Sequence, residues 1–400
     1  MRVKNKKGFD KMKVAFVHPL KHHIYNSMAG AMEENIDVVG LFGYYYNNDI
    51  LDKILKKSKY GSFIQGYCYK KIDDKVKTNL WIKILFLLYK IRPERFQNFY
   101  FKQYEKWVIK NLRNVDCIHV LQDYCNEVIR YAKNHGIRIV YEQIIAYDIQ
   151  QFIEQKGNPN TDLKLLRQKE NMQMADYILM ASDFVALSIE KHFPGLFTDK
   201  FRVIPYGANV EMFHYHKRYR ESTSPLRVLS VANISKRKGS NYLIEAVKKF
   251  APSEVQLTMI GVPDKDGEKM LMEVDEISSI QYIGRVPHTE IYKYFDSNDI
   301  FVLPSLAEGS SLSVYEAIAS GMPCIVTENV GSVITDKKDG IIIPVKNTKA
   351  IVDAINSFIS TPDLLEKMSD QTKKTIAKFT WTEYEKAVAN FYHKISKKSG

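Results

Sequence analysis

The chain has few cysteines, and they follow no ligand or disulfide pattern. The four cysteines of the 400 residues, Cys68, Cys117, Cys125 and Cys324, form no Cys-x-x-Cys pair. Zinc-binding and thioredoxin-like sites need such close spacing. We therefore expect reduced, mostly buried thiols, as in a cytosolic protein, and neither a zinc site nor a redox centre.

Long apolar runs are also missing. A membrane-spanning helix needs about 18 apolar residues or more, and the run that comes nearest, WIKILFLL at 81–88, is short and interrupted by Lys83. The N-terminus is too charged, and its apolar run too short, for a secretory signal. No G-x-G-x-x-G follows a strand-like run, which argues against a dehydrogenase. These absences favour a cytoplasmic protein.

Acidic residues are scarce in one region, which therefore carries most of the net charge of +12. Residues 51–113 contain 16 Lys/Arg and 5 Asp/Glu, with aromatic residues between them, among them Trp81, Phe86 and Tyr89. This basic region would suit an anionic membrane surface or a phosphorylated substrate. The alternative is a solvated helical face without a partner. No nucleic-acid-binding motif accompanies it, so we expect no nucleic-acid partner.

Short runs rich in β-branched residues alternate with amphipathic helical stretches. In the N-terminal half the strand-like runs are 13–18, 36–43, 116–121, 137–143, 176–182 and 201–207. After Pro225 they are 226–233, 255–261, 280–284, 299–304, 323–327 and 340–345, with helical stretches at 239–250, 288–297, 311–320 and 347–360. This alternation predicts an α/β fold with parallel sheets.

The pattern restarts once, so two doubly wound, Rossmann-like domains facing across a cleft are expected. The predicted organisation is a polar tail (1–11), an N-terminal domain (12–205), a linker (206–225), a C-terminal domain (226–378) and a final helix (379–400).

Three loops of the C-terminal half follow strands directly, where open parallel sheets bind ligands. In ISKRKGS (234–240) three basic residues precede a helix start, which favours an anion. The second loop is GRVPHTE (284–290), and the third is LPSLAEGSSLSVYEAIASGMP (303–323) with Glu308 and Glu316. Ser313 and Glu316 also fit a capping box, in which Glu316 would only cap the helix.

With these motifs the C-terminal half resembles the retaining, two-domain (GT-B) glycosyltransferases of family 4. Their signature is Glu-x7-Glu followed by Gly-x-Pro, preceded by a strand and a loop ending in Lys-Gly. This sequence has both in that order, with the joint VIPYGANVEMF (203–213) and a closing helix starting at FTW (379–381). The resemblance covers about residues 12–395 and is most specific in 200–345. It implies a GT-B fold whose C-terminal domain binds the donor nucleotide and whose N-terminal domain faces the acceptor.

The resemblance also implies roles on the donor side. Lys238 matches the lysine that stabilises the leaving diphosphate, and Glu308 the carboxylate facing the sugar and the diphosphate loop, so these are the expected catalytic residues. Glu316 matches the carboxylate that binds the ribose hydroxyls. The usual arginine partner of the lysine aligns with Asn233, and Arg237 is the candidate to replace it. The other expected donor contacts are Gly309, Ser310, Ser311, Arg285 and Val286.

The N-terminal half departs further from the family. Many relatives have a Gly-Gly pair after the first strand, where this sequence has HPLKHHIYNSMAG (18–30). Relatives often place a histidine after the strand that here ends in Glu142-Gln143. His119 matches a further position that is common in the family, but it lies inside a strand-like run, which favours a structural role. The acceptor-side candidates are His22, His23, Asn26, His119 and Gln143.

The implied function is transfer of a sugar from a nucleotide-sugar donor, a UDP-sugar being favoured, to a growing cell-surface glycan. The resemblance further implies a lipid-linked acceptor at the inner face of the membrane, and no cofactor or metal. Two alternatives remain open. A degenerate partner subunit or glycan-binding protein is favoured by Asn233 and opposed by the intact Lys238, Glu308 and Glu316. The other is a different nucleotide-sugar enzyme of the same fold, such as an epimerase or phosphorylase.

Overall fold

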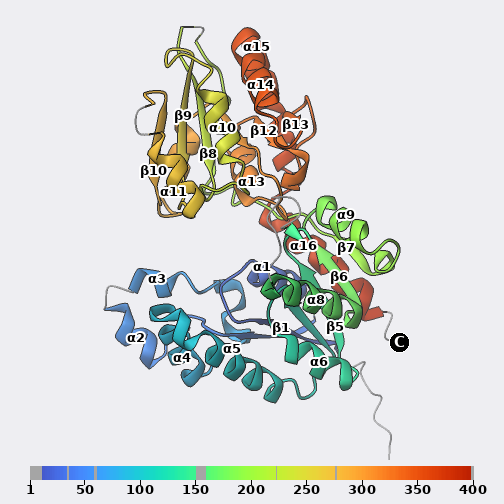
Figure 1. Cartoon of the computed structure of the whole chain (residues 1–400). Coiled ribbons are helices and arrows are strands. Elements are labelled where there is room, and N and C mark those ends of the chain that lie inside the picture. Colours follow the sequence, from blue (N-terminus) through green and yellow to red (C-terminus); the bar gives the residue numbers. More distant parts are fainter. Residues whose placement is uncertain are drawn as a thin grey trace, which may run out of the picture.

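The computed structural model of the chain describes residues 11–33, 36–57, 61–149, 159–221, 223–274 and 277–397. Two parallel sheets, each covered by helices, lie in separate halves of the molecule (Figure 1). The predicted α/β architecture of two doubly wound domains is confirmed. The predicted tail lies almost entirely outside the described residues.

The first sheet has the strand order β3-β2-β1-β4-β5-β6-β7 with parallel neighbours. Its strands are β1 (Lys13–His18), β2 (Asp37–Phe42), β3 (Val76–Lys77), β4 (Cys117–Leu121), β5 (Arg138–Gln143), β6 (Tyr177–Met180) and β7 (Phe201–Val203). Its helices are α1 (Ile24–Glu33), α2 (Ile50–Lys56), α3 (Gly61–Gln65), α4 (Leu80–Ile91), α5 (Pro93–Lys110), α6 (Asn126–Asn134), α8 (Pro159–Met174) and α9 (Asp183–His192), with 3-10 turns η1 (Lys70–Lys75) and η2 (Thr198–Lys200).

The second sheet has the order β10-β9-β8-β11-β12-β13. Its strands are β8 (Leu226–Val231), β9 (Val255–Ile260), β10 (Ile280–Gly284), β11 (Ile300–Leu303), β12 (Cys324–Thr327) and β13 (Gly340–Ile343). The helices are α10 (Ser240–Val247), α11 (Lys265–Met272), α12 (Tyr292–Ser297), α13 (Leu312–Ala319), α14 (Thr348–Ser360) and α15 (Pro362–Ile376), with the turn η3 (Glu328–Val330) and the last helix, α16 (Trp381–Lys397).

The central strands are apolar because helices cover both faces of each sheet. Strand β4 is buried along its whole length, and β11 likewise. In each sheet the order reverses beside its first strand, between β1 and β4 and between β8 and β11. Such reversals leave a crevice at the carboxyl ends of the strands, and the loops that follow these four strands supply most of the candidate site.

The sequence-based prediction missed β3, α11 and α15, and placed the start of α12 too early. Helix α11 contains Gly267, a poor helix former. Packing imposes this glycine, because a Cβ there would lie 2.0 Å from the carbonyl oxygen of Ile234. Tertiary contact thus overrides local propensity at this helix.

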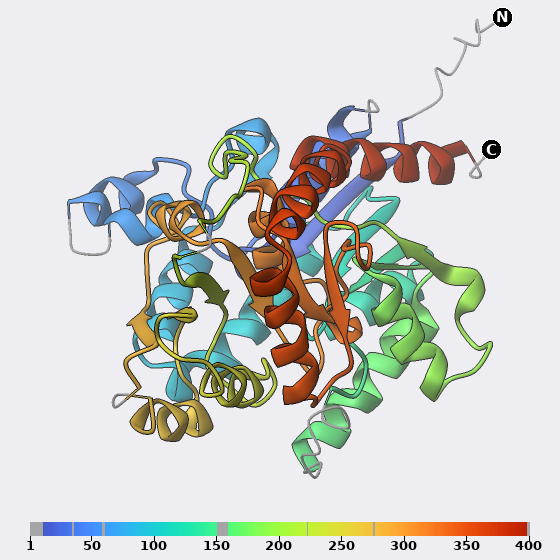
Figure 2. The same cartoon turned by 90° about the horizontal axis from the view of Figure 1, so that it is seen from above.

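The chain crosses between the halves twice, and the two crossings are paired. The Ala208 amide donates to the Phe379 carbonyl at 3.0 Å, and the Trp381 amide donates to the Ala208 carbonyl at 3.3 Å. Helix α16 then packs on α1, where the hydroxyls of Ser27 and Tyr384 lie 2.8 Å apart. Figure 2 shows α16, in dark red, beside the blue N-terminal elements.

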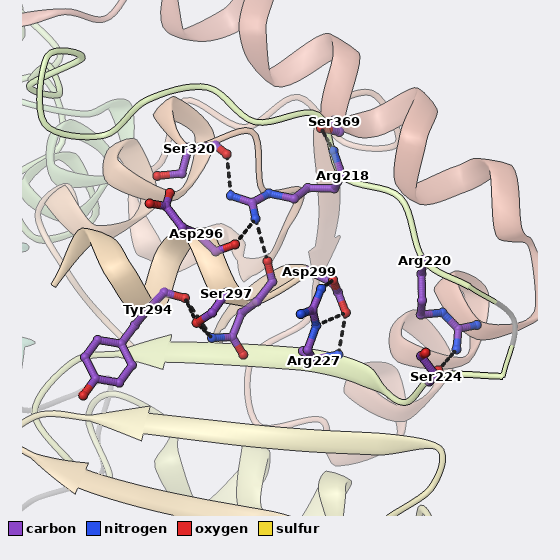
Figure 3. Close-up of polar contacts among 11 residues, drawn as sticks. Arg218, Arg220, Ser224, Arg227, Tyr294, Asp296, Ser297, Asp299, Ser320 and Ser369 are labelled. Atoms are coloured by element: carbon purple, nitrogen blue, oxygen red, sulfur yellow. Dashed lines mark hydrogen bonds and ion pairs between the residues drawn. The ribbon is translucent and has the colours of Figure 1, made fainter.

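A buried arginine fixes the linker to the C-terminal half. The guanidinium of Arg218 donates to the carbonyls of Asp296 (2.8 Å), Asn298 (3.0 Å) and Ser320 (2.6 Å), as Figure 3 shows. These carbonyls lie at the C-terminal ends of α12 and α13, where helices leave carbonyls unpaired and partially negative. The Arg218 amide also donates to Ser369 Oγ on α15 at 2.9 Å.

We predict that Arg218→Ala lowers the free energy of unfolding by about 3 kcal/mol, because it leaves three carbonyls without their charged donor. Urea denaturation followed by circular dichroism measures the change. The control is Arg220→Ala, since within the described residues the half-buried Arg220 donates to two carbonyls, of Ser224 and Ile359. A loss for Arg218→Ala no larger than that of the control would contradict this account of the linker.

Candidate functional site

A cavity of ≈ 560 Å³ lies between the two halves and is lined by both. The N-terminal half contributes His22, His23 and Asn26 from the segment that follows β1. The C-terminal half contributes Ser310 and Glu316. Predicted acceptor-side and donor-side residues therefore meet at one cavity, and their positions follow from the carboxyl ends of β1 and β11.

Glu308 does not itself line this cavity, and it binds two of the three basic residues of the ISKRKGS loop, Arg237 and Lys238. Its Oε1 lies 2.5 Å from Arg237 Nη1 and 2.7 Å from Lys238 Nζ. Gly239, at φ +69°, makes this possible, because a Cβ there would lie 2.0 Å from the Pro304 carbonyl oxygen. The structure thus joins two loops that are some 70 residues apart.

The cluster of Arg237, Lys238 and Glu308 has one more positive than negative charge. Glu308 is only 7% exposed. Burial lowers the pKa of Lys238, an effect that the nearby carboxylate of Glu308 opposes. A partly desolvated cationic pair of this kind suits a diphosphate, since charges act more strongly where water is excluded.

The loop that follows Glu308 offers free backbone donors. Among the described residues, the amides of Gly309, Ser310 and Ser311 have no hydrogen-bond partner. They precede α13, whose N-cap residue is Ser311. Free amides at a helix N-terminus bind anions, so this segment and the basic cluster both suit a negatively charged ligand.

The N-terminal half touches this loop directly. Ser182 Oγ donates to the Gly309 carbonyl, and the Ala146 amide donates to the Glu308 carbonyl at 3.2 Å. A Cβ on Gly309 would lie 1.8 Å from the carbonyl oxygen of Ile144. Only glycine therefore permits this approach of the two halves.

Glu316 does not cap its helix. Helix α13 begins at Leu312 without a side-chain cap, so the capping box predicted from Ser313 and Glu316 is not formed. Instead Glu316 Oε1 lies 3.1 Å from Nε2 of His288, which also lines the cavity, and this hydrogen bond raises the pKa of His288. The carboxylate is thus directed toward the cavity.

The histidines on the acceptor side surround a buried carboxylate. Glu142 Oε1 lies 2.5 Å from His23 Nε2, and its Oε2 lies 3.1 Å from His119 Nε2. Strand β5 ends in Glu142 and Gln143, and Glu142 contacts His23, which lines the cavity. Gln143 is buried outside the cavity, donating to the Ile145 carbonyl at 2.9 Å. His119 lies behind Glu142, with its Nδ1 2.9 Å from Tyr392 OH.

Other predicted donor contacts lie outside the cavity. Asn233 and Arg285 are exposed, and neither lines it, while Val286 packs against the core. Sequence reasoning missed His288 and also Glu385 on α16, which accepts from Tyr69 OH at 2.6 Å and Asn26 Nδ2 at 3.3 Å. No local signal could have revealed Glu385, because its partners lie more than 300 residues away.

Within the described residues, no group of three or more His, Cys, Asp or Glu side chains could hold a metal ion. No helix in those residues is long and apolar enough to cross a bilayer.

Comparison with known proteins bears first on the half that carries Glu308 and Glu316. Residues 212–375 match the family model described as "Glycosyl transferases group 1". These residues are therefore similar to a group 1 glycosyltransferase domain. Of the solved structures, sucrose-phosphate synthase from Thermosynechococcus elongatus superposes with a TM-score of 0.69 at 14% identity, over 97% of this chain and 100% of that one.

Two further solved structures extend the likeness across both halves. Anabaena HepE in complex with UDP superposes with a TM-score of 0.66 at 12% identity, over 96% of this chain and 100% of that one. The lipopolysaccharide outer core galactosyltransferase WaaB does so with 0.64 at 18%, over the same shares. The chain therefore has the GT-B fold, as the sequence resemblance predicted.

Two curated relatives match this chain over a smaller share of their length than the solved structures do. The amylovoran biosynthesis glycosyltransferase AmsK of Erwinia amylovora is 32% identical over 144 residues, which is 33% of this chain and 35% of AmsK. An uncharacterized glycosyltransferase of Haemophilus influenzae is 26% identical over 36% of this chain and 43% of that protein. The chain thus spans less than half the length of these two relatives.

The buried His18 beneath the cavity predicts a pH-dependent stability. Burial lowers its pKa from 6.5 to about 4, despite the carbonyl of Leu20 2.6 Å from its Nδ1. As the pH falls from about 6.5 toward about 4, the unfolded chain binds the proton before the folded protein does, so the free energy of unfolding falls. The resulting loss of stability at pH 4.5 is about 2 kcal/mol.

We expect the wild type to lose about 2 kcal/mol more stability between pH 7 and pH 4.5 than His18→Asn does, measured by urea denaturation at both values. His135→Asn, which changes an exposed histidine on the surface, should keep the wild-type slope. Equal slopes for all three proteins would contradict the assignment of a neutral, buried His18.

Proposed function

We propose that this protein is a retaining glycosyltransferase that moves a sugar from a nucleotide-sugar donor to a glycan acceptor in cell-surface polysaccharide synthesis. A UDP-sugar is the favoured donor, a lipid-linked glycan the favoured acceptor, and no metal or cofactor takes part. The observation that carries the proposal is the cationic pair of Arg237 and Lys238 on Glu308, next to the free amides of Gly309–Ser311.

The chemistry of sugar transfer accounts for this arrangement. Negative charge builds up on the diphosphate as its bond to the sugar breaks, and fixed cations and amides directed there lower the barrier. Arg237 takes the place of the family arginine that aligns with the exposed Asn233. Glu316, at the cavity, is the candidate for the ribose hydroxyls. The choice of a UDP-sugar is supported by the HepE structures, which hold UDP and UDP-glucose.

The role in polysaccharide synthesis rests on relatives. AmsK is named for amylovoran biosynthesis, and WcaL of Escherichia coli, 25% identical over 195 residues, is a putative glycosyltransferase of colanic acid biosynthesis. Both matches cover less than half of this chain.

Glu308→Gln and Lys238→Ala should each lower turnover about 100-fold or more, because each removes charge that acts in the transition state. Glu316→Gln should mainly weaken donor binding. Initial rates and calorimetric titration with the sugar nucleotide measure the two effects. Wild-type turnover and affinity in all three folded variants would favour a degenerate partner subunit instead.

A thermal-shift panel of sugar nucleotides tests that alternative and identifies the donor, since ligand at 100 times its Kd adds roughly 2.7 kcal/mol of stability. Proton NMR of the first product should then show retention of the donor's anomeric configuration. Excess EDTA should leave the rate unchanged. An inverted product, or loss of activity in EDTA, would overturn the corresponding part of the proposal.

We further propose that the basic region 51–113 holds the protein at the inner, anionic membrane surface. Exposed apolar side chains lie in and next to this region on two neighbouring helices (Figure 1), Ile50 and Ile54 on α2 and Leu80 and Trp81 on α4. The helices are tied together by Lys83, whose Nζ lies 2.7 Å from Asp49 and 2.9 Å from Asp52. Phe86 is fully buried and cannot insert, contrary to the sequence-based grouping with Trp81.

Each Lys or Arg near an anionic surface contributes about 1 kcal/mol. We therefore expect sedimentation with anionic but not neutral liposomes at about 0.1 M salt, and weaker binding at about 1 M, where the Debye length falls from ~10 Å to ~3 Å. Changing Lys53, Lys56 and Lys57, all exposed, to Glu should abolish binding. Lys59, a further sequence candidate, lies outside the described residues.

The matched control changes three exposed lysines of the C-terminal half, Lys265, Lys349 and Lys367, to Glu. This triple variant has the same net charge and should still bind. Equal, negligible sedimentation of the wild type with both lipids at low salt would favour a soluble acceptor.

A further inference from the structure

The acceptor side of the cavity has a basic rim. Lys21, Cys68 and Tyr69 line the cavity, and Lys70 follows Tyr69 directly in the chain. Burial and the charge of Asp73 raise the pKa of the Cys68 thiol, whereas the charges of Lys21 and Lys70 act in the opposite direction. The two rim lysines, Lys21 and Lys70, therefore lie within electrostatic reach of the same point of the cavity wall.

The rim lysines have no acidic partner. Among the described residues, no carboxylate lies within ion-pair distance of Lys21 or Lys70, and both side chains are exposed. The next lysine along the chain differs, because Lys71 Nζ lies 2.5 Å from Glu385 Oε2 and its charge is balanced there. The rim lysines therefore retain positive charge that an anionic ligand can balance.

The carboxylates that act electrostatically on the same groups have partners of their own. Asp73 accepts a hydrogen bond from Tyr45 OH at 2.5 Å. Glu316 lies 3.1 Å from His288, whose pKa this hydrogen bond raises and the charge of Lys21 lowers. Lys21 thus acts on the donor side of the cavity as well, and neither carboxylate forms an ion pair with a rim lysine.

The chain runs directly from this rim to the proposed membrane surface. After Lys70, η1 and β3 lead to Thr78, whose Oγ1 accepts from Asn47 Nδ2 at 3.1 Å. Asn47 lies just before α2 and Thr78 just before α4, the two helices with exposed apolar side chains (Figure 1). At the cavity end the segment is held by Tyr45, whose hydroxyl accepts from the Tyr69 amide at 2.9 Å. The rim therefore connects the cavity with the surface proposed to face the membrane.

Resting on the function proposed above, we infer that Lys21 and Lys70 bind the phosphate groups through which the acceptor glycan is attached to its lipid. Lysine ammonium groups bind phosphate oxygens through charge-assisted hydrogen bonds. From this point the glycan extends into the cavity toward Ser310 and Glu316, and the lipid extends toward α2 and α4. The lipid phosphate is thus part of what the protein recognises in its acceptor.

The donor diphosphate has a different candidate site. Its expected partners, Arg237, Lys238 and the free amides that precede α13, all belong to the C-terminal half, and neither basic residue lines the cavity. The rim lysines belong to the N-terminal half. Two anion sites on different halves match the two substrates of the proposed reaction, each of which carries phosphate.

The test is isothermal titration calorimetry of the full chain with geranyl diphosphate, a soluble mimic of a lipid diphosphate. The protein is first saturated with the nucleoside diphosphate of the donor that the thermal-shift panel identifies, so that the donor's anion site is occupied. We expect geranyl diphosphate to bind and geraniol, which lacks the phosphates, not to bind. Lys21→Gln and Lys70→Gln should each weaken binding about 10-fold, because each removes one charge-assisted interaction. Donor affinity and melting temperature should not change.

The matched control is Lys75→Gln. Lys75 is an exposed lysine of the same turn, η1, but it does not line the cavity. This variant should bind geranyl diphosphate as the wild type does.

A second measurement separates the acceptor from membrane headgroups as the source of the phosphate. Lys21→Gln should sediment with anionic liposomes as the wild type does, because Lys21 lies at the cavity and not on α2 or α4.

The possible failures are distinguishable. Wild-type affinity for geranyl diphosphate in both rim variants, or no binding of it to the nucleotide-saturated wild type, would overturn the acceptor subsite and leave the proposed function intact. A parallel loss of donor affinity would make the rim lysines donor-binding residues instead. Loss of liposome binding in Lys21→Gln would assign the rim to membrane headgroups. A wild type that binds no sugar nucleotide would overturn the proposed function and this inference together.

Discussion

The candidate site depends on one close backbone approach, that of the N-terminal loop 144–146 to Glu308 and Gly309. It requires a residue without a side chain at 309, since a Cβ would lie 1.8 Å from the Ile144 carbonyl oxygen. The contact also fixes the direction of the loop at 308–309, because the Glu308 carbonyl accepts from the Ala146 amide and the Gly309 carbonyl accepts from Ser182 Oγ. The amides of the same loop remain free on the other side for an anion.

The fold and the donor side could be predicted largely from the sequence. Strands buried on both faces appear as continuous apolar runs. The strand-loop-helix motifs place Lys238 and Glu308 in the loops that follow strands and Glu316 in the helix after the second loop, whatever the remote context. Local pattern was insufficient for α11, where Gly267 weakens the helical signal and packing against Ile234 supplies the stability. It also suggested a cap for Glu316 that the helix start at Leu312 excludes.

The acceptor side could not be predicted in the same detail, because its polar contacts join distant parts of the chain. Glu142 meets His23 across 119 residues, and Glu385 meets Asn26 across 359. Neither pairing follows a periodicity or a spacing. The contacts of His23 and His119 with Glu142 therefore become visible only in three dimensions.

The paired crossings at Ala208 and Thr380 have a mechanical consequence for the cavity. Twisting or sliding of the two halves would break the hydrogen bonds that join the crossings, whereas a hinge rotation about them would not. Among the described residues, the hydrogen bonds from Ala146 to Glu308 and from Ser182 to Gly309 are the ones that such a rotation would break, each contributing about 1 kcal/mol. The arrangement therefore favours a hinge motion over a twist, and that motion would separate the loop at 308–311 from the N-terminal half.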